Sequence, residues 1–217
     1  MEKYLAPSIL AADFANLGTQ LHIIEDEGVE YLHLDVMDGM FVSSISFGMP
    51  VIKSLRSATN MKFDVHMMVV EPERYFQALK EAGADIISIH IEACHSPKNE
   101  LIRLKEMGIT PALAFNPETD VKELVPYLPY VEQVLLMSVN PGFGGQKFIE
   151  ASYDRIKELA EIRQNMGLDF LIEVDGGANF ENASKILQCG TDILVAGSAC
   201  FKGDVRYNTK KFMEIMK

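Results

Sequence analysis

Eight short apolar runs, rich in β-branched residues, alternate with eight longer amphipathic runs along this chain. The short runs predict strands, and the longer runs, whose apolar residues recur with a helical period, predict helices. The expected strands cover residues 4–8, 31–36, 62–66, 85–90, 110–115, 133–138, 170–175 and 192–196. The expected helices cover residues 14–27, with Asp13 as N-cap, then 49–56, a segment beginning near Pro72, 97–107, 119–125, 152–166, 180–188 and 207–216.

This alternation favours a closed barrel of parallel strands. The strands are apolar on both faces, as expected for a sheet that helices cover. Three expected helices end at a glycine that precedes a strand and fits a C-terminal cap, namely Gly28, Gly83 and Gly190. We predict an α/β fold of the (β/α)8 TIM-barrel type, with residues 1–217 as a single domain of about 27 residues per unit. A doubly wound open sheet is the second choice.

Polar side chains gather where the expected strands end. His33 and Asp35 lie on one face of the second strand, because side chains two apart point the same way. His66 ends the third strand and Asp175 the seventh. Two histidines and two carboxylates at one end of a barrel suit a divalent zinc, iron(II), manganese or cobalt ion. A set of hydrogen-bonded core residues is the alternative, which four such groups at the same end make less favoured.

The second and seventh strands lie on opposite sides of an eight-stranded barrel, so Asp35 and Asp175 are expected to flank a substrate from two faces. A metal ion between them would polarise a carbonyl group and stabilise an enediolate. One carboxylate would remove a proton α to the carbonyl, and the other would return a proton to the opposite face. The pattern therefore predicts a two-base epimerisation.

Glycine-rich segments follow the sixth, seventh and eighth strands. They are Asn140 to Gln146, with glycines at 142, 144 and 145, then Gly176-Gly177, and Gly197-Ser198. Glycines let backbone N–H groups approach an oxyanion, and barrel enzymes often bind phosphate after strands 7 and 8. Each segment alone is more often a tight turn, but together they favour a phosphate site.

Charge and cysteine content limit the remaining classes. The net charge of −11, with no basic stripe, excludes a nucleic-acid surface but permits a local phosphate pocket. Three cysteines without metal-type spacing indicate a reduced, cytoplasmic protein. We expect no secretory signal and no membrane span, because Pro7 interrupts the start and no uncharged apolar run is long enough.

Several other residues at the strand ends have two possible roles. Met37, Met68 and Met137 fit an apolar lid over the reacting carbons or adaptable core filling, with neither preferred. His90 ends the fourth strand, where it either supports the site residues or only packs, and simple packing is the favoured interpretation.

Six segments resemble, in order along the chain, the signatures of the ribulose-phosphate 3-epimerase family. They are residues 6–14 (APSILAADF), 33–39 (HLDVMDG), 64–69 (DVHMMV), 137–146 (MSVNPGFGGQ), 173–177 (EVDGG) and 196–198 (AGS). The resemblance covers essentially the whole chain. It implies a homo-oligomeric isomerase that interconverts ribulose 5-phosphate and xylulose 5-phosphate in the pentose phosphate pathway.

The resemblance also implies roles for individual residues. Asp35 is expected to accept the proton and Asp175 to donate it. The implied metal ligands are His33, Asp35, His66 and Asp175. The implied substrate-binding residues are Ser8, His66, Gly142, Phe143, Gly144, Gly145, Asp175, Gly176, Gly177, Gly197 and Ser198.

Departures from the family pattern lie near the second strand and after the fourth. Ser43-Ser44 stands where Pro-Asn is usual, Met40 where a polar residue is common, and Ile91 where the family has proline. The related allulose-6-phosphate 3-epimerases share the metal and glycine motifs, so a six-carbon substrate stays open.

Two further alternatives are weighed. Barrel aldolases and decarboxylases use a lysine at a strand end, but Lys62 begins a strand and Lys147 and Lys202 lie in loops. A non-catalytic sugar-phosphate-binding barrel would not need both Asp35 and Asp175.

Overall fold

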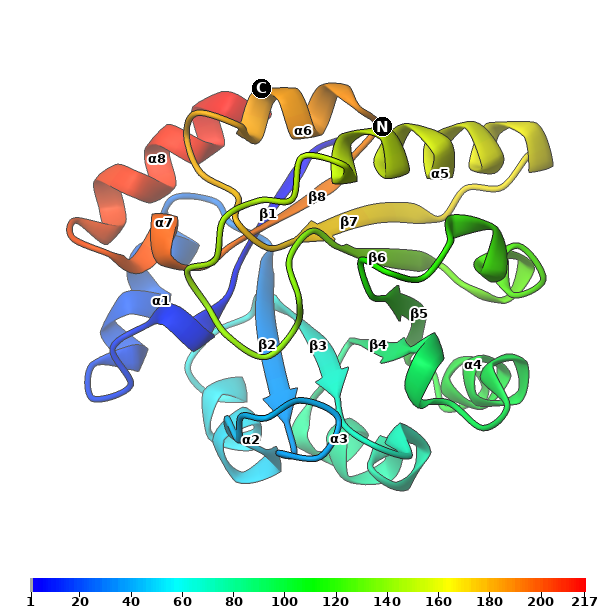
Figure 1. The fold of residues 1–217 in the computed structure, drawn as a ribbon. Coiled ribbons are helices and arrows are strands. Elements are labelled where there is room, and N and C mark those ends of the chain that lie inside the picture. Colours follow the sequence, from blue (N-terminus) through cyan, green and yellow to red (C-terminus); the bar gives the residue numbers. More distant parts are fainter. Residues whose placement is uncertain (1) are drawn as a thin grey trace.

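The computed structural model, which describes residues 2–217, is a barrel of eight parallel strands (Figure 1). Neighbouring strands follow one another around the barrel in chain order, so each crossover leads to the adjacent strand. The strands are β1 (Tyr4–Pro7), β2 (Tyr31–Met37), β3 (Lys62–Met68), β4 (Ile86–His90), β5 (Thr110–Phe115), β6 (Gln133–Met137), β7 (Leu171–Asp175) and β8 (Ile193–Ala196). The prediction of a TIM barrel is confirmed.

The barrel has one weak seam, between β1 and β2. Seven strand pairs form parallel ladders, including β1 with β8, where Tyr4 lies opposite Ile193. Between β1 and β2 the structure has a single bridge, which joins Ser8 to His33. The side chain of Ser8 also donates a hydrogen bond of 2.5 Å to Asp35 across this seam.

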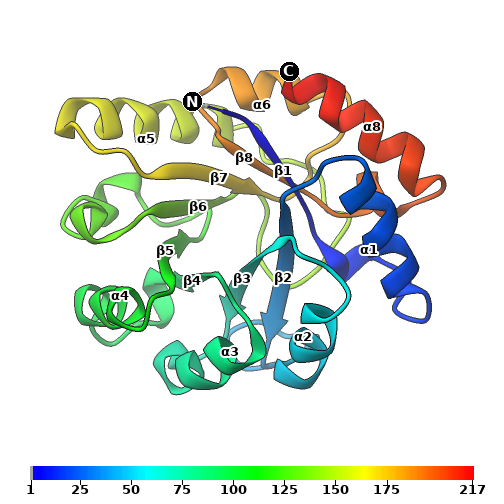
Figure 2. The same cartoon turned by 180° about the vertical axis from the view of Figure 1, so that it is seen from behind.

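Helices cover the outside of the barrel, as the two opposite views show (Figures 1 and 2). The α-helices are α1 (Leu17–Asp26), α2 (Met49–Arg56), α3 (Phe76–Ala82), α4 (Pro97–Glu106), α5 (Ser152–Met166), α6 (Ala183–Gln188), α7 (Ser198–Phe201) and α8 (Val205–Met216). Short 3-10 helices occur at Ile9–Ala11, Pro72–Arg74, Ile91–Ala93, Val121–Leu124 and Leu128–Tyr130. Among residues 2–217, no helix is long and apolar enough to cross a membrane.

Two local predictions about helices are wrong. Asp13 does not cap α1, which starts at Leu17, because its carboxylate accepts from the backbone N–H of Ala15 within a turn before the helix. The expected helix at 119–125 is instead a 3-10 turn over Val121–Leu124. Asp120 caps that turn, and its carboxylate accepts a hydrogen bond from the backbone N–H of Lys122.

The three predicted cap glycines adopt the left-handed backbone that this role requires, with φ of 86° at Gly28, 98° at Gly83 and 119° at Gly190. Apolar side chains fill the layer between strands and helices, and a smaller apolar cluster that includes Ala6 and Ile193 closes the lower part of the barrel interior. The polar side chains above that cluster therefore belong to the carboxyl end of the strands.

Candidate active site

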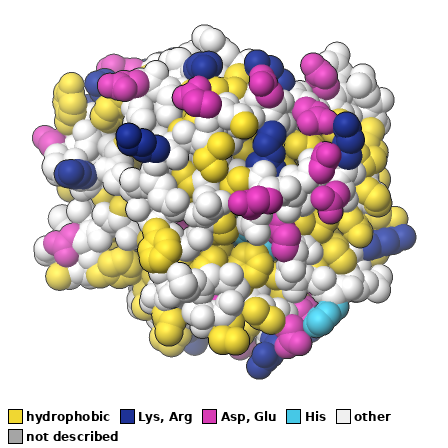
Figure 3. Space-filling view, viewed as in Figure 1, with side chains coloured by type: hydrophobic (Ala, Val, Ile, Leu, Met, Phe, Trp, Pro, Cys, Tyr) yellow, Lys and Arg dark blue, Asp and Glu magenta, His cyan; other side chains and the backbone are white. Residues whose placement is uncertain are grey.

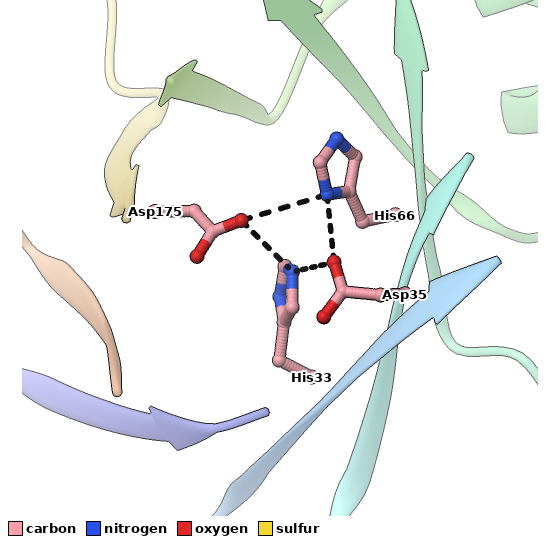
Figure 4. Close-up of side chains that lie close together, drawn as sticks. All are labelled: His33, Asp35, His66 and Asp175. Atoms are coloured by element: carbon pink, nitrogen blue, oxygen red, sulfur yellow. Dashed lines mark hydrogen bonds and ion pairs between the residues drawn. The ribbon is translucent and has the colours of Figure 1, made fainter. Parts of the chain in front are cut away.

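Four side chains meet at the carboxyl end of the barrel, where the sequence places them (Figure 4). His33 and Asp35 come from β2, His66 from β3 and Asp175 from β7. One ligand atom from each lies within 4.8 Å of those of the other three. Asp35 Oδ1 is 3.4 Å from His33 Nε2 and 3.1 Å from His66 Nδ1, and Asp175 Oδ2 is 3.8 Å and 3.7 Å from the same two nitrogens.

A buried polar layer lies beneath His33. Its Nδ1 is 3.1 Å from Glu173 and 3.3 Å from Asp64, and Gln133 donates hydrogen bonds to both carboxyl groups. Ring nitrogen Nδ1 of His33 therefore donates downward, which leaves Nε2 facing the four-residue cluster. The sequence analysis missed these three supporting residues. A signal existed, because Asp64 and Glu173 each lie two positions before a site residue and so share its inward face.

The two aspartates have opposite shifts in pKa. Burial would raise the pKa of Asp35, but the neighbouring His33 holds it below its usual value. Burial and the negative charge of Asp35 raise the pKa of Asp175 to about 7. Without a cation, Asp35 is therefore ionised near neutral pH while Asp175 is partly protonated, which is the pattern of an acid–base pair.

The two histidines also differ. Burial alone would lower the pKa of His33, but Asp35 and Glu173 raise it well above its usual value. Burial lowers the pKa of His66 to about 4, so its ring is neutral. The cluster thus stabilises one positive charge close to His33 Nε2, with a neutral imidazole at its edge.

The donor set fits a divalent metal ion. His33 Nε2 is buried and has no hydrogen-bond partner among the described residues. Its nearest polar contacts are the oxygens of Asp35 and Asp175 at 3.4 Å and 3.8 Å, and so loose a pairing of a buried nitrogen is costly unless something binds it. Two imidazole nitrogens and two carboxylates supply the mixed nitrogen and oxygen ligands that zinc, iron(II), manganese and cobalt accept.

The pocket above the cluster is lined by the glycine-rich loops. Its walls include Ser8, Asp35, Gly142 to Gly145, Asp175 to Gly177, Gly197 and Ser198. The loop between β6 and α5 crosses the mouth of the barrel in Figure 1, with Phe143 60% exposed on it. Figure 3 shows hydrophobic side chains around the hollow at this end. The described lining contains no lysine or arginine, so its donors for an anion are backbone N–H groups and neutral side chains such as the Ser198 hydroxyl.

Two glycines in this lining occupy positions where a side chain would clash with its neighbours. Gly176 and Gly177 have φ of 120° and 69°. A Cβ atom on Gly176 would lie 2.4 Å from the Val139 side chain, and one on Gly177 would lie 2.3 Å from the backbone nitrogen of Phe148. The loops after β6 and β7 therefore pack backbone against backbone, which is what close approach to a ligand also requires.

The methionines that had two readings line the pocket. Met37, Met68 and Met137 are 5%, 1% and 1% exposed and belong to its walls, with Leu10 and Val139. They form a buried apolar side of the pocket. His90 does not merely pack, because its Nε2 lies 2.8 Å from His66 Nε2.

Comparison with known proteins places this site in a family. The sequence profile of the family described as "Ribulose-phosphate 3 epimerase family" matches residues 4–201. The chain belongs to that family. A ribulose-phosphate 3-epimerase from Bacillus subtilis is 44% identical over 198 residues, which are 91% of each chain. One from Aquifex aeolicus is 40% identical and covers 99% of this chain and 97% of its own. As a member, the protein is an epimerase, an enzyme of the isomerase class.

Solved structures of more distant proteins share the fold alone. The 3-hexulose-6-phosphate synthase from Salmonella typhimurium has a TM-score of 0.75 and 17% identity, and covers all of this chain and 98% of its own. A tryptophan synthase α-subunit from Pyrococcus furiosus has a TM-score of 0.73 and 17% identity, with 100% and 99% covered. These similarities agree with the eight-stranded barrel.

Proposed function

We propose that this chain catalyses the metal-dependent epimerisation at C3 of D-ribulose 5-phosphate to D-xylulose 5-phosphate. One observation carries the proposal: two carboxyl groups, Asp35 and Asp175, come from strands on different sides of the barrel and share one pocket. The names of the relatives supply the substrate.

The two aspartates divide the proton transfers between them. Asp35, whose pKa is lowered, is ionised and accepts the C3 proton from one face of the substrate. Asp175 donates a proton to C3 from the other face. In the reverse direction the roles exchange, because the product carries its C3 hydrogen on the side of Asp175. Ser8 keeps the Asp35 carboxylate in place through its 2.5 Å hydrogen bond.

His33 Nε2, His66 Nδ1 and the two aspartates would hold the metal ion. A bound zinc, iron(II), manganese or cobalt ion would polarise the substrate carbonyl and stabilise the negative charge of the enediolate. The buried layer of Asp64, Gln133 and Glu173 orients the His33 ring for this role.

The phosphate group binds the glycine-rich loops in this proposal. Gly142, Phe143, Gly144 and Gly145 lie on the loop after β6, while Gly176, Gly177, Gly197 and Ser198 follow β7 and β8. Their backbone N–H groups compensate for the lack of a cationic side chain in the described lining. The walls formed by Met37, Met68 and Met137 exclude water from the reacting carbons.

Turnover of the purified protein tests the proposal. We expect epimerase activity on ribulose 5-phosphate that a chelator removes and added metal restores. Asp35→Asn and Asp175→Asn should each lower turnover by about 10²- to 10⁴-fold, while Asp175→Asn still binds the substrate. Asp154→Asn, at a side chain that is 86% exposed, is the matched control.

Allulose 6-phosphate is assayed beside the pentose. Preference for the hexose would move the substrate to six carbons with the same residues, and turnover that survives Asp175→Asn would refute the two-base mechanism. Cytoplasmic location and a homo-oligomeric state stay predictions.

A further inference from the structure

A chain of hydrogen bonds runs outward from His66, away from the site. Nε2 of His66 lies 2.8 Å from Nε2 of His90, and Nδ1 of His90 lies 3.1 Å from Oε2 of Glu92. Figure 4 shows this second nitrogen of His66 pointing away from Asp35 and Asp175. Both imidazole rings are fully buried, their centroids are 5.0 Å apart, and their planes are inclined by 27°, so the rings meet edge to edge at the two Nε2 atoms.

The far end of this chain is fixed by backbone. Oε1 of Glu92 accepts a 2.8 Å hydrogen bond from the backbone N–H of Asn116 and another from the Thr119 hydroxyl. Arg155 holds the same loop through the carbonyl oxygens of Asn116 and Thr119, at 2.8 Å and 2.7 Å. Burial would raise the pKa of Glu92, but the hydrogen bonds from His90 and Asn116 hold it below its usual value. Glu92 is therefore ionised.

These contacts determine where each proton lies. An ionised carboxylate only accepts, so His90 must carry its proton on Nδ1. When the His90 ring carries this single proton, its Nε2 presents a lone pair, and the 2.8 Å contact then places the proton of His66 on Nε2. The remaining nitrogen of neutral His66, Nδ1, is left with a lone pair that faces Asp35 and Asp175.

We propose that His90 and Glu92 are positioning residues that hold His66 as the Nε2–H tautomer, with the Nδ1 lone pair aimed into the cluster. This inference deepens the proposed function and rests on its metal site. Without the chain, the Nδ1–H tautomer of His66 would donate to Asp35 Oδ1, 3.1 Å away, and would have to be displaced before a cation could bind. Outer-shell partners of metal-binding histidines typically contribute 10- to 100-fold in metal affinity.

Glu92→Gln is the most informative variant because it keeps the size of the side chain. The backbone N–H of Asn116 requires an acceptor, so the amide oxygen takes the place of Oε1 and the NH₂ group faces His90. His90 must then accept at Nδ1 and donate from Nε2, which forces the proton of His66 onto Nδ1. The substitution is thus predicted to reverse both tautomers from a position outside the cluster.

Nitrogen-15 NMR of histidine-labelled protein, before and after addition of zinc, reads the tautomers directly. In the zinc-free wild type we expect His66 to be protonated on Nε2, and in Glu92→Gln on Nδ1. Competition with a chromophoric chelator should show zinc binding about 10- to 100-fold weaker in Glu92→Gln. Glu118→Gln, which removes an exposed charge from the same loop, should change neither reading.

A second pair of variants, at His90, tests the inference if the Glu92→Gln protein does not fold. His90→Gln retains an acceptor for His66 and should keep wild-type tautomer and zinc affinity, whereas His90→Leu should lose both. Ser88→Ala trims the same inward face of β4 at a hydroxyl that has no hydrogen-bond partner among residues 2–217, and serves as control.

An unchanged His66 tautomer in both Glu92→Gln and His90→Leu would overturn the inference. These readings need neither substrate nor turnover. A protein with the expected tautomers and no epimerase activity would therefore refute the proposed function and leave the positioning chain standing.

Discussion

Asp175→Asn should stabilise the metal-free protein while it abolishes turnover. Burial and the charge of Asp35 raise the pKa of Asp175 from 3.8 to about 7. A shift of this size means that ionising Asp175 lowers the free energy of unfolding by about 4 kcal/mol. Because 17% of the side chain is exposed, solvent screening should make the measured difference smaller.

The pH dependence follows from the direction of the shift. A carboxyl group with a raised pKa in the folded state gives its full contribution below pH 3.8 and loses it as the pH rises through about 7. The asparagine variant has no such loss. In the presence of a chelator, the two proteins should be equally stable near pH 4 and should differ most at pH 7 and above.

Urea unfolding and thermal unfolding at several pH values measure this difference. For a chain of this size, 1 kcal/mol moves the melting temperature by about 2–4 °C, so a gap on the order of 10 °C is expected at pH 8. Added metal should close the gap, since it binds the wild type more tightly and stabilises it by mass action. Asp154→Asn is again the control. A gap that is the same at pH 4 and pH 8 would refute the reasoning.

Three further predictions concern other parts of the fold. Gly177→Ala should lower thermal stability and raise KM for the sugar phosphate, because its Cβ would lie 2.3 Å from a backbone nitrogen of the neighbouring loop; an unchanged KM would contradict the packing described. Arg163→Ala should lower the free energy of unfolding in urea by about 1.5–3 kcal/mol, since the buried carboxylate of Asp192 loses one charged hydrogen-bond donor and keeps Lys3 as the other; a cost below 1 kcal/mol would contradict this. Burial raises the pKa of the Cys94 thiol, and it raises the pKa of the Cys200 thiol to about 12. Both thiols should therefore react slowly with Ellman's reagent at pH 8 until urea is added.

The sequence predicted the barrel and the four converging side chains because both follow from periodicity. Spacing of two along β2 places His33 and Asp35 on one face, and parallel strands bring that face to the end where His66 and Asp175 also lie. Neither conclusion requires atomic coordinates.

The supporting residues could not be predicted in the same way. The role of His90 depends on the direction of its ring and on Glu92, which reaches back from a 3-10 turn after the strand. Packing sets the direction of these side chains. The ring of Phe41 lies against the His90 ring, with centroids 4.8 Å apart. Asp13 was wrong for a related reason, because a carboxylate can accept from a local turn as readily as from the first turn of a helix.

The seam between β1 and β2 gives this chain a particular order of assembly. The first strand forms its ladder with β8, and the residues at the start of that pairing, Lys3 and Asp192, are 189 positions apart. At ordinary rates of translation, β1 would leave the ribosome roughly 10–40 s before its partner. Ser8 follows directly on β1 and bonds Asp35, so the catalytic pocket is completed by the last strand to be made. A nascent chain therefore has no active stage before β8 has folded into place.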